Sequence, residues 1–487
     1  MAILKDLLYK VSIQSVFGDT SMEVNNIVFD SRLVNENDLF VAVIGTQSDG
    51  HEYIQQVVEK GVKAIVCEVF PEQLLEGITY VQVHNSAQAL GIISSNYYHN
   101  PSSKLKLVGV TGTNGKTSTV TILHRLFRKL GYQVGLLSTV ENRINETIYP
   151  STHTTPDPVQ LNRMLAEMLS HNCTHVFMEV SSHAAVQQRI AGLDFSGAVF
   201  TNITHDHLDY HKTFDEYIRA KKMFFDALSS SAFSLVNIDD KRGTVMQQNT
   251  KSVKYSFAIQ NSADFKAKIK SNSFHGLEIE IDNKDIWFKQ IGKFNAYNLL
   301  GVYATAVLLD EDKEEVLMQL SNIDTAKGRF EVLRSVSGII AIVDYAHTPD
   351  ALQNVLDTIN DLRQGHEKII TVVGCGGNRD KAKRPVMAGI AAKNSNKVIL
   401  TSDNPRTESP ELIIQEMEAG VGIVEKKKVL SITDRKEAIK TACSLASSGD
   451  IILIAGKGHE NYQEINGVKH HFDDQEEVLQ IFQLLGI

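Results

Sequence analysis

A strand-like run that ends in a glycine-rich loop constrains this chain more than any other feature of its sequence. Residues 107–111 (Leu-Val-Gly-Val-Thr) are apolar and β-branched, and residues 112–118 (Gly-Thr-Asn-Gly-Lys-Thr-Ser) follow at once. Residues 119–130 then show a helical period, with apolar side chains four apart on one face and Gly131 as the C-cap. The sequence predicts a buried strand, a tight loop and a helix in succession.

This strand–loop–helix order is typical of sites that bind phosphate groups. Glycines let successive backbone N–H groups turn toward phosphate oxygens, and the helix N-terminus adds partial positive charge. Lys116 would reach the outer phosphates, and the Thr117 hydroxyl would hold Mg²⁺. The general pattern G-x-x-x-x-G-K-[ST] is not met, because Val110 stands five residues before Gly115. A chance glycine turn is the alternative, but it would not require the strand and the helix on either side. We therefore predict a bound nucleoside triphosphate.

Further buried strands alternate with helical segments along the rest of the chain. Apolar runs this continuous are typical of strands covered by helices on both faces, as in a parallel sheet. The predicted fold class is therefore α/β. The strand candidates are residues 105–111, 175–180, 197–203, 339–345, 368–374, 397–401 and 450–455.

The length of 487 residues is too great for a single hydrophobic core, so several domains are expected. Residues 100–104 (Asn-Pro-Ser-Ser-Lys) are polar and contain a proline just before the phosphate-loop strand, and residues 328–331 precede another strand candidate. We therefore divide the chain into residues 1–102, 103–330 and 331–487.

Composition excludes several classes of function. The net charge of −9 argues against a nucleic-acid binder, which would show a basic face. The four cysteines are scattered and form no C-x-x-C pair, so neither a zinc knuckle nor a disulfide framework is expected. No apolar run reaches membrane-spanning length, and residues 1–6 carry charges where a signal peptide would be apolar. We expect a cytoplasmic protein that does not insert into a membrane.

Acids and histidines downstream of the loop are candidate metal ligands. Glu179 ends a strand candidate, where a second Mg²⁺ partner is usual, although a structural role is the alternative. His205, His207 and His211 would suggest zinc, but triphosphate-bound Mg²⁺ prefers oxygen with at most an occasional imidazole, so we single out only His207. Lys221 lies on a predicted helix, where a solvated side chain is the default interpretation.

Taken together, these segments resemble the Mur ligase family, and within it the ligases that add the third amino acid to the peptidoglycan precursor. The resemblance covers essentially the whole chain, with the motifs in order, and its Gly-Thr-Asn-Gly-Lys-Thr signature accounts for the imperfect phosphate-loop pattern. The matching segments are residues 30–32, 112–118, 152–157, 179–183, 206–211, 220–221, 295–298, 328–329, 344–349, 374–380, 403–406 and 456–460.

The resemblance implies an N-terminal α/β domain for the UDP end of the substrate, a central ATPase domain with a mostly parallel sheet, and a C-terminal Rossmann-like domain that brings the amino acid. It also implies that Lys221 is carbamylated to N6-carboxylysine. A carbamate is an anionic oxygen ligand, which suits Mg²⁺. The implied ligands of two Mg²⁺ ions are Thr117, Glu179, His207 and carbamylated Lys221.

The resemblance assigns residues to each substrate. The implied catalytic residues are Lys116, Lys221, His207 and Asp344. The implied ATP-binding residues are Gly112, Thr113, Asn114, Gly115, Lys116, Thr117, Ser118, Asn295, Asn298 and Arg329. The implied UDP-MurNAc-dipeptide-binding residues are Ser31, Thr154, Thr155, Ser181, Gln187 and Arg189, with residues 46–48 near the uracil. Thr46 departs from a histidine common in the family, and Asn298 is alternatively a helix cap.

Three strand candidates of the C-terminal domain each lead into a polar loop. Ligands of open parallel sheets bind beyond the carboxyl ends of the strands, so these loops should converge on one site. Residues 403–406 (Asp-Asn-Pro-Arg) match the family members that add meso-diaminopimelate, and Arg406 would receive the distal carboxylate that lysine lacks. A surface arginine after a turn is the alternative. The implied diaminopimelate-binding residues are Arg379, Asp403, Asn404, Pro405, Arg406, Gly456 and Glu460.

The implied reaction starts from UDP-MurNAc-L-Ala-D-Glu and ATP. ATP would phosphorylate the γ-carboxylate of the D-glutamate, and the amine of meso-diaminopimelate would displace phosphate from the acyl phosphate. Two Mg²⁺ ions and Lys116 would neutralise the reacting anions, and closure of the C-terminal domain would exclude water. No residue of the sequence stands out as the base for the amine. We expect a monomer that binds only these small molecules.

Three alternatives stay open. A lysine-adding enzyme of the same family would differ in its amino-acid substrate. A folylpolyglutamate synthase should lack both the residue 403–406 motif and the N-terminal domain. A catalytically decayed structural or regulatory protein would have lost Lys116, Glu179 or Lys221, which are all present.

Overall fold

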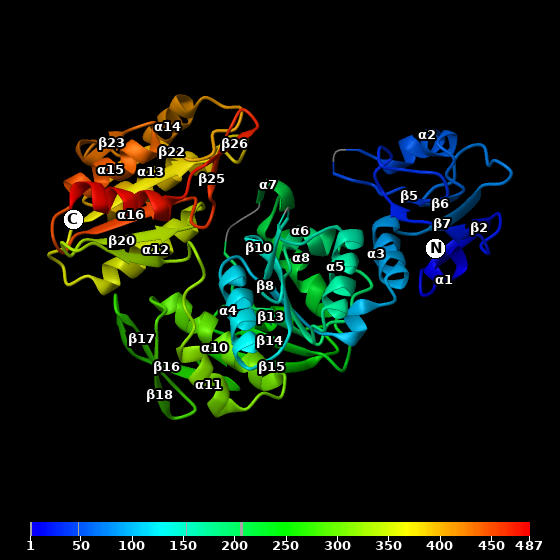
Figure 1. Ribbon diagram of the computed structural model, residues 1–487, viewed down its shortest axis with the longest axis horizontal. Helices are drawn as coiled ribbons and strands as arrows, with labels where there is room; N and C mark the ends of the chain where they lie inside the picture. The colour runs from blue at the N-terminus through cyan, green and yellow to red at the C-terminus, as the bar shows by residue number, and fades with distance from the viewer. Residues whose placement is uncertain (1, 47, 152, 205–207) are drawn as a thin grey trace.

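The computed structural model describes residues 2–46, 48–151, 153–204 and 208–487. The chain forms three lobes, each built around one sheet, and Figure 1 shows them in chain order from blue through green to red. The predicted α/β class and the three-domain arrangement are confirmed. Within the described residues, no helix combines the length and the apolar character that crossing a bilayer requires.

The N-terminal lobe holds a sheet in which strands β4 to β7 are parallel and β2 is antiparallel at one edge. The sheet order is β2 (Ile13–Phe17), β7 (Thr79–Val83), β6 (Ala64–Cys67), β5 (Leu39–Val41) and β4 (Ile27–Val28). A two-stranded ribbon joins β1 (Ala2–Ile3) to β3 (Glu23–Val24). The helices are α1 (Leu4–Leu7), α2 (Ile54–Glu59) and α3 (Ser86–Tyr97), with 3₁₀ turns at Gly50–Tyr53 and Pro101–Lys104.

The central lobe holds an extended sheet whose middle strands are parallel and whose ends are antiparallel hairpins. Its order is β11 (Thr147–Pro150), β10 (Glu141–Ile144), β9 (Val134–Leu137), β12 (His175–Glu179), β8 (Lys106–Thr111), β13 (Gly197–Phe200), β14 (Phe233–Asn237), β15 (Val253–Ala258), β16 (Phe265–Ser273), β17 (Gly276–Ile281) and β18 (Lys284–Phe288). The helices are α4 (Lys116–Lys129), α5 (Pro158–Ser170), α6 (Ser182–Val186), α7 (Leu208–His211), α8 (Phe214–Asp226), α9 (Gly243–Met246), α10 (Lys293–Leu308) and α11 (Lys313–Ser321).

The C-terminal lobe holds a sheet that is parallel except for its edge strand β19. Its order is β19 (Glu331–Arg334), β20 (Ile340–Asp344), β24 (Ile451–Ala455), β21 (Ile369–Cys375), β22 (Lys397–Ser402) and β23 (Val429–Ser431), and a hairpin pairs β25 (Tyr462–Ile465) with β26 (Val468–His471). The helices are α12 (Pro349–Leu362), α13 (Lys383–Asn394), α14 (Pro410–Glu418), α15 (Arg435–Leu445) and α16 (Asp474–Leu485), with a 3₁₀ turn at Glu425–Lys428.

The seven predicted strands are present, because their apolar runs are buried on both faces between helices. The clearest departure is β13, which ends at Phe200 although the predicted strand extends to residue 203. Beyond Phe200 the chain bends over the glycine loop, where the Thr201 hydroxyl donates a hydrogen bond to the carbonyl of Asn114 at 2.6 Å. The parallel strands of the central and C-terminal sheets end near one another, so the loops that follow them can form one site.

Candidate functional site

The glycine loop between β8 and α4 has the geometry of a compact anion-binding loop. Gly115 immediately precedes α4 with φ at +86°, and a Cβ there would lie 2.5 Å from the side-chain oxygen of Asn298. Only glycine fits both restrictions. The Lys116 ammonium folds back over the loop and donates to the carbonyls of Gly112 and Thr113, each at 2.9 Å. A cationic group and a helix N-terminus therefore point at the same space.

Glu179 lies at the carboxyl end of β12 and is fully buried. Its carboxylate accepts hydrogen bonds from the Thr117 hydroxyl at 2.9 Å, from the Thr139 backbone N–H at 2.9 Å and from the Thr139 hydroxyl at 3.2 Å. These three donors are neutral, and burial of a carboxylate is costly. A divalent cation bound here would offset that cost, so the site fits Mg²⁺.

Lys221 is buried on α8, with 2% of the residue exposed. Its ammonium donates to the Gly112 carbonyl at 2.9 Å and lies 4.6 Å from the centre of the Tyr217 ring. The default interpretation of a solvated lysine is therefore wrong, because this face of α8 packs behind the glycine loop. His207, the remaining predicted metal ligand, lies outside the described residues. Among the residues that are described, no cluster of three His, Cys, Asp or Glu side chains could hold a metal by itself.

The junction between the central and C-terminal lobes brings Arg329 and Asp344 to the loop. The Arg329 guanidinium donates to the Thr117 hydroxyl at 3.1 Å and lies 4.8 Å from the centre of the Tyr345 ring. The Asp344 carboxylate accepts from the Phe330 backbone N–H at 2.7 Å. Burial raises the pKa of Asp344 to about 6, although the nearby Arg329 charge acts in the opposite direction.

Asp350 at the start of α12 is a contact across the same junction that the sequence did not indicate. Its carboxylate accepts from the Asn114 side-chain amide at 3.0 Å and from the Thr204 hydroxyl at 2.9 Å. The N-cap Thr348 and the following proline mark a helix start, which was the available signal. Asn298 lies inside α10, where its amide donates to Asn295 at 3.1 Å, so the helix-cap alternative is wrong.

Four of the predicted dipeptide-binding residues lie around the end of β12. The Thr155 hydroxyl donates to the Glu179 carbonyl at 2.8 Å and accepts from the Ser181 backbone N–H at 3.2 Å. Arg189 donates to the Thr155 carbonyl at 2.8 Å, and the Thr139 and Thr154 hydroxyl oxygens lie 3.0 Å apart, within hydrogen-bond distance. These contacts join the predicted dipeptide end to the carboxylate of Glu179.

The other predicted residues for this substrate are less closely joined to the group. Gln187 contacts Arg189, whose guanidinium donates to the Gln187 side-chain oxygen at 2.6 Å. Ser31 lies apart from the group, in the N-terminal lobe, where its carbonyl accepts from the Lys60 ammonium at 2.7 Å. Within the predicted uracil-proximal stretch, Gln47 lies outside the described residues.

The loops after β21, β22 and β24 converge as predicted from their strand-end positions. The Asn404 amide donates to Glu460 at 2.7 Å, and a Cβ at Gly456 would lie 2.6 Å from an Asp403 carboxylate oxygen. Burial raises the pKa of Glu460, and the neighbouring Asp403 charge acts in the same direction. Glu460 already pairs with the buried Lys457 ammonium at 3.2 Å, and Asp403 lies 4.0 Å from the same ammonium.

Arg406 belongs to the same site and not to the outer surface. Its side chain is 19% exposed, its guanidinium donates to the Gly377 carbonyl at 2.9 Å, and it pairs with Glu464 at 3.3 Å. The alternative of a surface arginine is therefore wrong. Lys457 is not among the predicted site residues. It is fully buried and donates to Asn404 at 3.3 Å and to Glu460 at 3.2 Å. Its place between two glycines at a strand end was the signal available.

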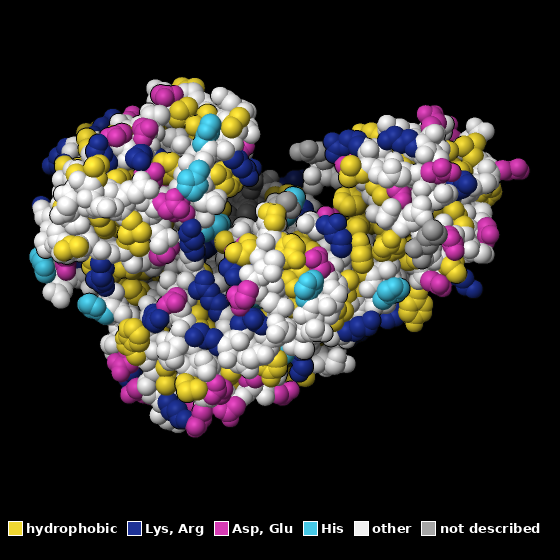
Figure 2. Space-filling view, viewed as in Figure 1, with side chains coloured by type: hydrophobic (Ala, Val, Ile, Leu, Met, Phe, Trp, Pro, Cys, Tyr) yellow, Lys and Arg dark blue, Asp and Glu magenta, His cyan; other side chains and the backbone are white. Residues whose placement is uncertain are grey.

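One connected cavity of about 2120 Å³ joins the two halves of the site. At one end it is lined by the glycine loop, Glu179 and Lys221, and at the other by Arg379, Arg406 and Glu460. Figure 2 shows the molecular surface deeply hollowed between the C-terminal and N-terminal lobes, above the central lobe. A triphosphate and an amino acid bound at the two ends would face each other across a continuous space.

Comparisons with known proteins agree with this arrangement. The Mur ligase family catalytic domain matches residues 23–98, the Mur ligase middle domain matches residues 110–306, and the glutamate ligase domain of Mur ligases matches residues 328–458. Together these matches cover well over half of the chain.

Named relatives extend over the full length. A protein of Cytophaga hutchinsonii, named UDP-N-acetylmuramoyl-L-alanyl-D-glutamate–2,6-diaminopimelate ligase, is 63% identical over 99% of both chains. A protein of Bacteroides fragilis with the same name is 54% identical, again over 99% of both. A solved structure of an enzyme with that name is 30% identical, with a TM-score of 0.69 over 100% of this chain and 99% of the other. The chain therefore belongs to the Mur ligase family.

Proposed function

We propose that this chain is an ATP-dependent amide ligase that adds meso-diaminopimelate to UDP-MurNAc-L-Ala-D-Glu, a step of peptidoglycan precursor synthesis in the cytoplasm. The observation that carries the proposal is that one connected cavity is lined by the glycine loop at one end and by Arg406 at the other. The names of the relatives from Cytophaga hutchinsonii and Bacteroides fragilis support the same substrates. We further propose that domains end near residues 102 and 330, and that the enzyme acts as a monomer.

In the proposed reaction, a γ-carboxylate oxygen of the D-glutamate attacks the terminal phosphorus of ATP, and ADP leaves. Lys116 and the N-terminus of α4 hold the phosphates, while Thr154, Thr155, Ser181 and Arg189 orient the dipeptide beside Glu179. When bound at Thr117, Glu179, His207 and carbamylated Lys221, two Mg²⁺ ions would neutralise anions that otherwise repel each other. The contact of Thr117 with Glu179 and the contact of Lys221 with Gly112 in the same glycine loop support this assignment.

The second half of the proposed reaction forms the amide. The amine of diaminopimelate loses a proton and attacks the carbonyl carbon of the acyl phosphate, and the C–O bond to phosphate breaks. Glu460, Asp403 and Asn404 would hold the amino-acid end, and Arg379 and Arg406 would take carboxylates bidentately. Arg329 and Asp344 would close the lobe junction over the nucleotide and keep water from the acyl phosphate.

Phosphate release by the purified protein tests the proposal. With ATP, Mg²⁺ and UDP-MurNAc-L-Ala-D-Glu, we expect sustained release with meso-diaminopimelate and little with L-lysine, because lysine lacks the distal carboxylate that Arg406 would bind. Equal rates with the two amino acids would contradict the specificity and retain the ligase. Absence of substrate-dependent release would contradict the ligase itself.

A further inference from the structure

Two loops of the C-terminal lobe touch each other backbone to backbone beside Arg406. The first follows β21 at residues 376–380, and the second follows β22 at residues 403–408. The Gly377 N–H donates to the Asn404 carbonyl at 2.8 Å, and the Arg406 guanidinium donates to the Gly377 carbonyl at 2.9 Å. A Cβ at Gly377 would lie 1.9 Å from the Pro405 carbonyl oxygen, so this approach requires glycine. The direction of the Arg406 side chain therefore depends on how the two loops are joined.

Both loops also contain a non-glycine residue with left-handed backbone. Asn378 and Arg406 each have φ at +53°, a conformation that L-residues adopt only at some cost in energy. Asn378 is held from the second loop, because its side-chain oxygen accepts from the Thr407 hydroxyl at 2.9 Å and from the Thr407 N–H at 3.2 Å. Such strained positions persist only where their surroundings hold them firmly.

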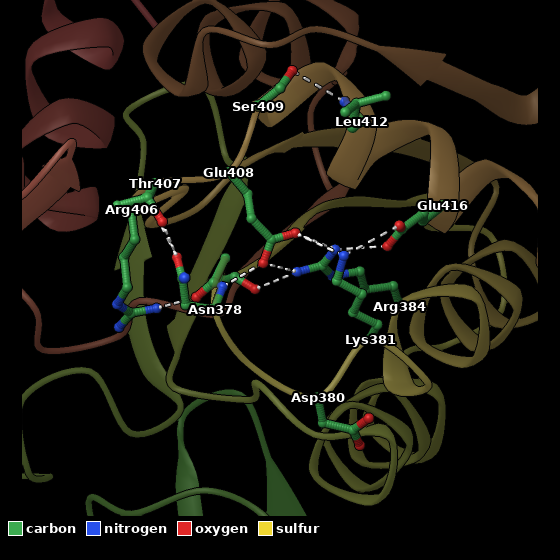
Figure 3. A network of polar contacts seen from close by, with 12 residues as sticks. Asn378, Asp380, Lys381, Arg384, Arg406, Thr407, Glu408, Ser409, Leu412 and Glu416 are labelled. Carbon is green, nitrogen blue, oxygen red and sulfur yellow. Dashed lines mark hydrogen bonds and ion pairs between the residues drawn. The ribbon is translucent and has the colours of Figure 1, made fainter.

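Glu408 provides the firmest of these connections (Figure 3). Its carboxylate accepts from the Asn378 N–H at 2.5 Å, which ties the second loop to the first. It also accepts two hydrogen bonds from the Arg384 guanidinium, both at 3.0 Å. Hydrogen bonds from Arg384 lower the pKa of Glu408 to about 2, so the carboxylate remains ionised throughout the neutral range.

Arg384 lies on α13 and also connects the two loops. It is fully buried, and besides Glu408 it donates to the Gly376 carbonyl in the first loop at 3.2 Å. Its second acidic partner is Glu416 on α14, at 2.6 Å. Figure 3 shows the guanidinium between the two carboxylates, with Arg406 on the opposite side of Glu408. The buried Arg384 guanidinium thus donates hydrogen bonds to both loops.

We propose that the Arg384–Glu408 pair is a positioning device that fixes the joined loops and so presents the Arg406 guanidinium to the distal carboxylate of diaminopimelate. This inference rests on the proposed function. Neither residue needs to touch the substrate, since each acts through Asn378, Gly376 and Arg406. A bidentate contact tolerates displacements of only about half an ångström, so release of the loops weakens carboxylate recognition selectively.

Replacement of Glu416 is a matched control for replacement of Glu408, because it also removes one negative charge beside the Arg384 guanidinium. Glu408→Gln and Glu416→Gln each remove one carboxylate from the same buried guanidinium, but only Glu408 contacts the Asn378 N–H. We expect Glu408→Gln to raise the KM for diaminopimelate at least tenfold and to leave the KM values for ATP and the UDP-dipeptide within twofold. We expect Glu416→Gln to leave all three KM values within twofold.

Selectivity gives a readout that general loss of stability would not change. Because lysine lacks the distal carboxylate, Glu408→Gln should lower the ratio of kcat/KM for diaminopimelate to kcat/KM for L-lysine at least tenfold. Thr407→Val, which removes the Thr407 hydroxyl and leaves the buried charges in place, should raise the KM for diaminopimelate about threefold. If Glu408→Gln does not fold, the KM of Thr407→Val for diaminopimelate tests the proposal instead.

The possible failures are distinguishable. Equal effects of Glu408→Gln and Glu416→Gln, or a uniform fall in kcat with unchanged selectivity, would overturn the positioning role alone. An unchanged KM for diaminopimelate in Thr407→Val would do the same where Glu408→Gln cannot be purified. A wild-type protein that releases no phosphate with diaminopimelate would overturn the proposed function and the inference with it.

Discussion

Replacement of Asp344 by asparagine should stabilise the C-terminal lobe while it removes activity. Asp344 is buried at the end of β20, beside Arg329, and its carboxylate accepts a hydrogen bond from the Phe330 N–H. Burial raises the pKa of its carboxyl from 3.8 to about 6, so the ionised form is less favourable in the folded protein than in the unfolded chain. Asparagine keeps an oxygen that can accept from Phe330 and carries no charge to bury.

The magnitude follows from that shift in pKa. A rise of about two pKa units corresponds to about 3 kcal/mol of stability that is lost when the group is ionised in both states. The pKa of Asp344 is higher in the folded protein than in the unfolded chain. The loss of stability that its charge causes is therefore absent below pH 4, grows as the pH rises from 4 to 6, and is complete above pH 6. The shift already includes the attraction to Arg329. After allowance of about 1–2 kcal/mol for the burial of the asparagine amide N–H groups, asparagine should gain about 1–2 kcal/mol at pH 8.

Hydrogen exchange of the β20 and β24 amides measures this gain locally, which suits a protein of several lobes. At pH 8 these amides should exchange about tenfold more slowly in Asp344→Asn than in the wild type. The ratio should fall toward one at pH 5, because only about half of the cost of the Asp344 charge remains there and the burial of the amide offsets it. A ratio that does not change between pH 5 and pH 8 would refute the argument, because it would mean that burial does not disfavour the Asp344 charge. The same variant should show at least a hundredfold loss of phosphate release, because we propose that Asp344 is a catalytic residue.

Three further substitutions test the other parts of the site. Glu179→Gln should lower kcat at least a hundredfold and raise the Mg²⁺ concentration needed for half-maximal phosphate release, without loss of thermal stability; an unchanged Mg²⁺ requirement would contradict the metal assignment. A folded Lys221→Ala enzyme should lose nearly all activity, and full activity would contradict the carbamate. Arg406→Ala should raise the KM for diaminopimelate about a hundredfold and leave the low activity with L-lysine unchanged, and an equal loss with both amino acids would exclude specific recognition of the distal carboxylate.

Local sequence patterns predicted much of the fold because they reflect burial and backbone geometry within short segments. The glycine loop before α4 is recognisable since residue types and order determine how its N–H groups point. The parallel strands are recognisable because both of their faces are buried, and the strand-end loops of the C-terminal lobe converge for topological reasons. The hairpin β17–β18 was not predicted, although residues 277–281 alternate between apolar and charged side chains, a pattern typical of a half-buried strand.

Contacts between distant segments explain what the sequence did not predict. Asn114 and Asp350 are 236 positions apart, and only the packing of two lobes brings them together. Lys221 is buried because α8 packs against the glycine loop, whereas a lysine on an isolated helix would be solvated. The role of Arg384 behind two loops depends likewise on tertiary packing, since an arginine in a helix usually lies on the surface.

The central claim is that the two ends of one cavity act in sequence on the same carboxylate. The most direct measurement uses UDP-MurNAc-L-Ala-D-Glu labelled with oxygen-18 in the γ-carboxylate, together with ATP and meso-diaminopimelate. The account predicts that the released phosphate carries one labelled oxygen, because the C–O bond of the acyl phosphate breaks when the amide forms. Phosphate without the label, released together with the amide product, would contradict it.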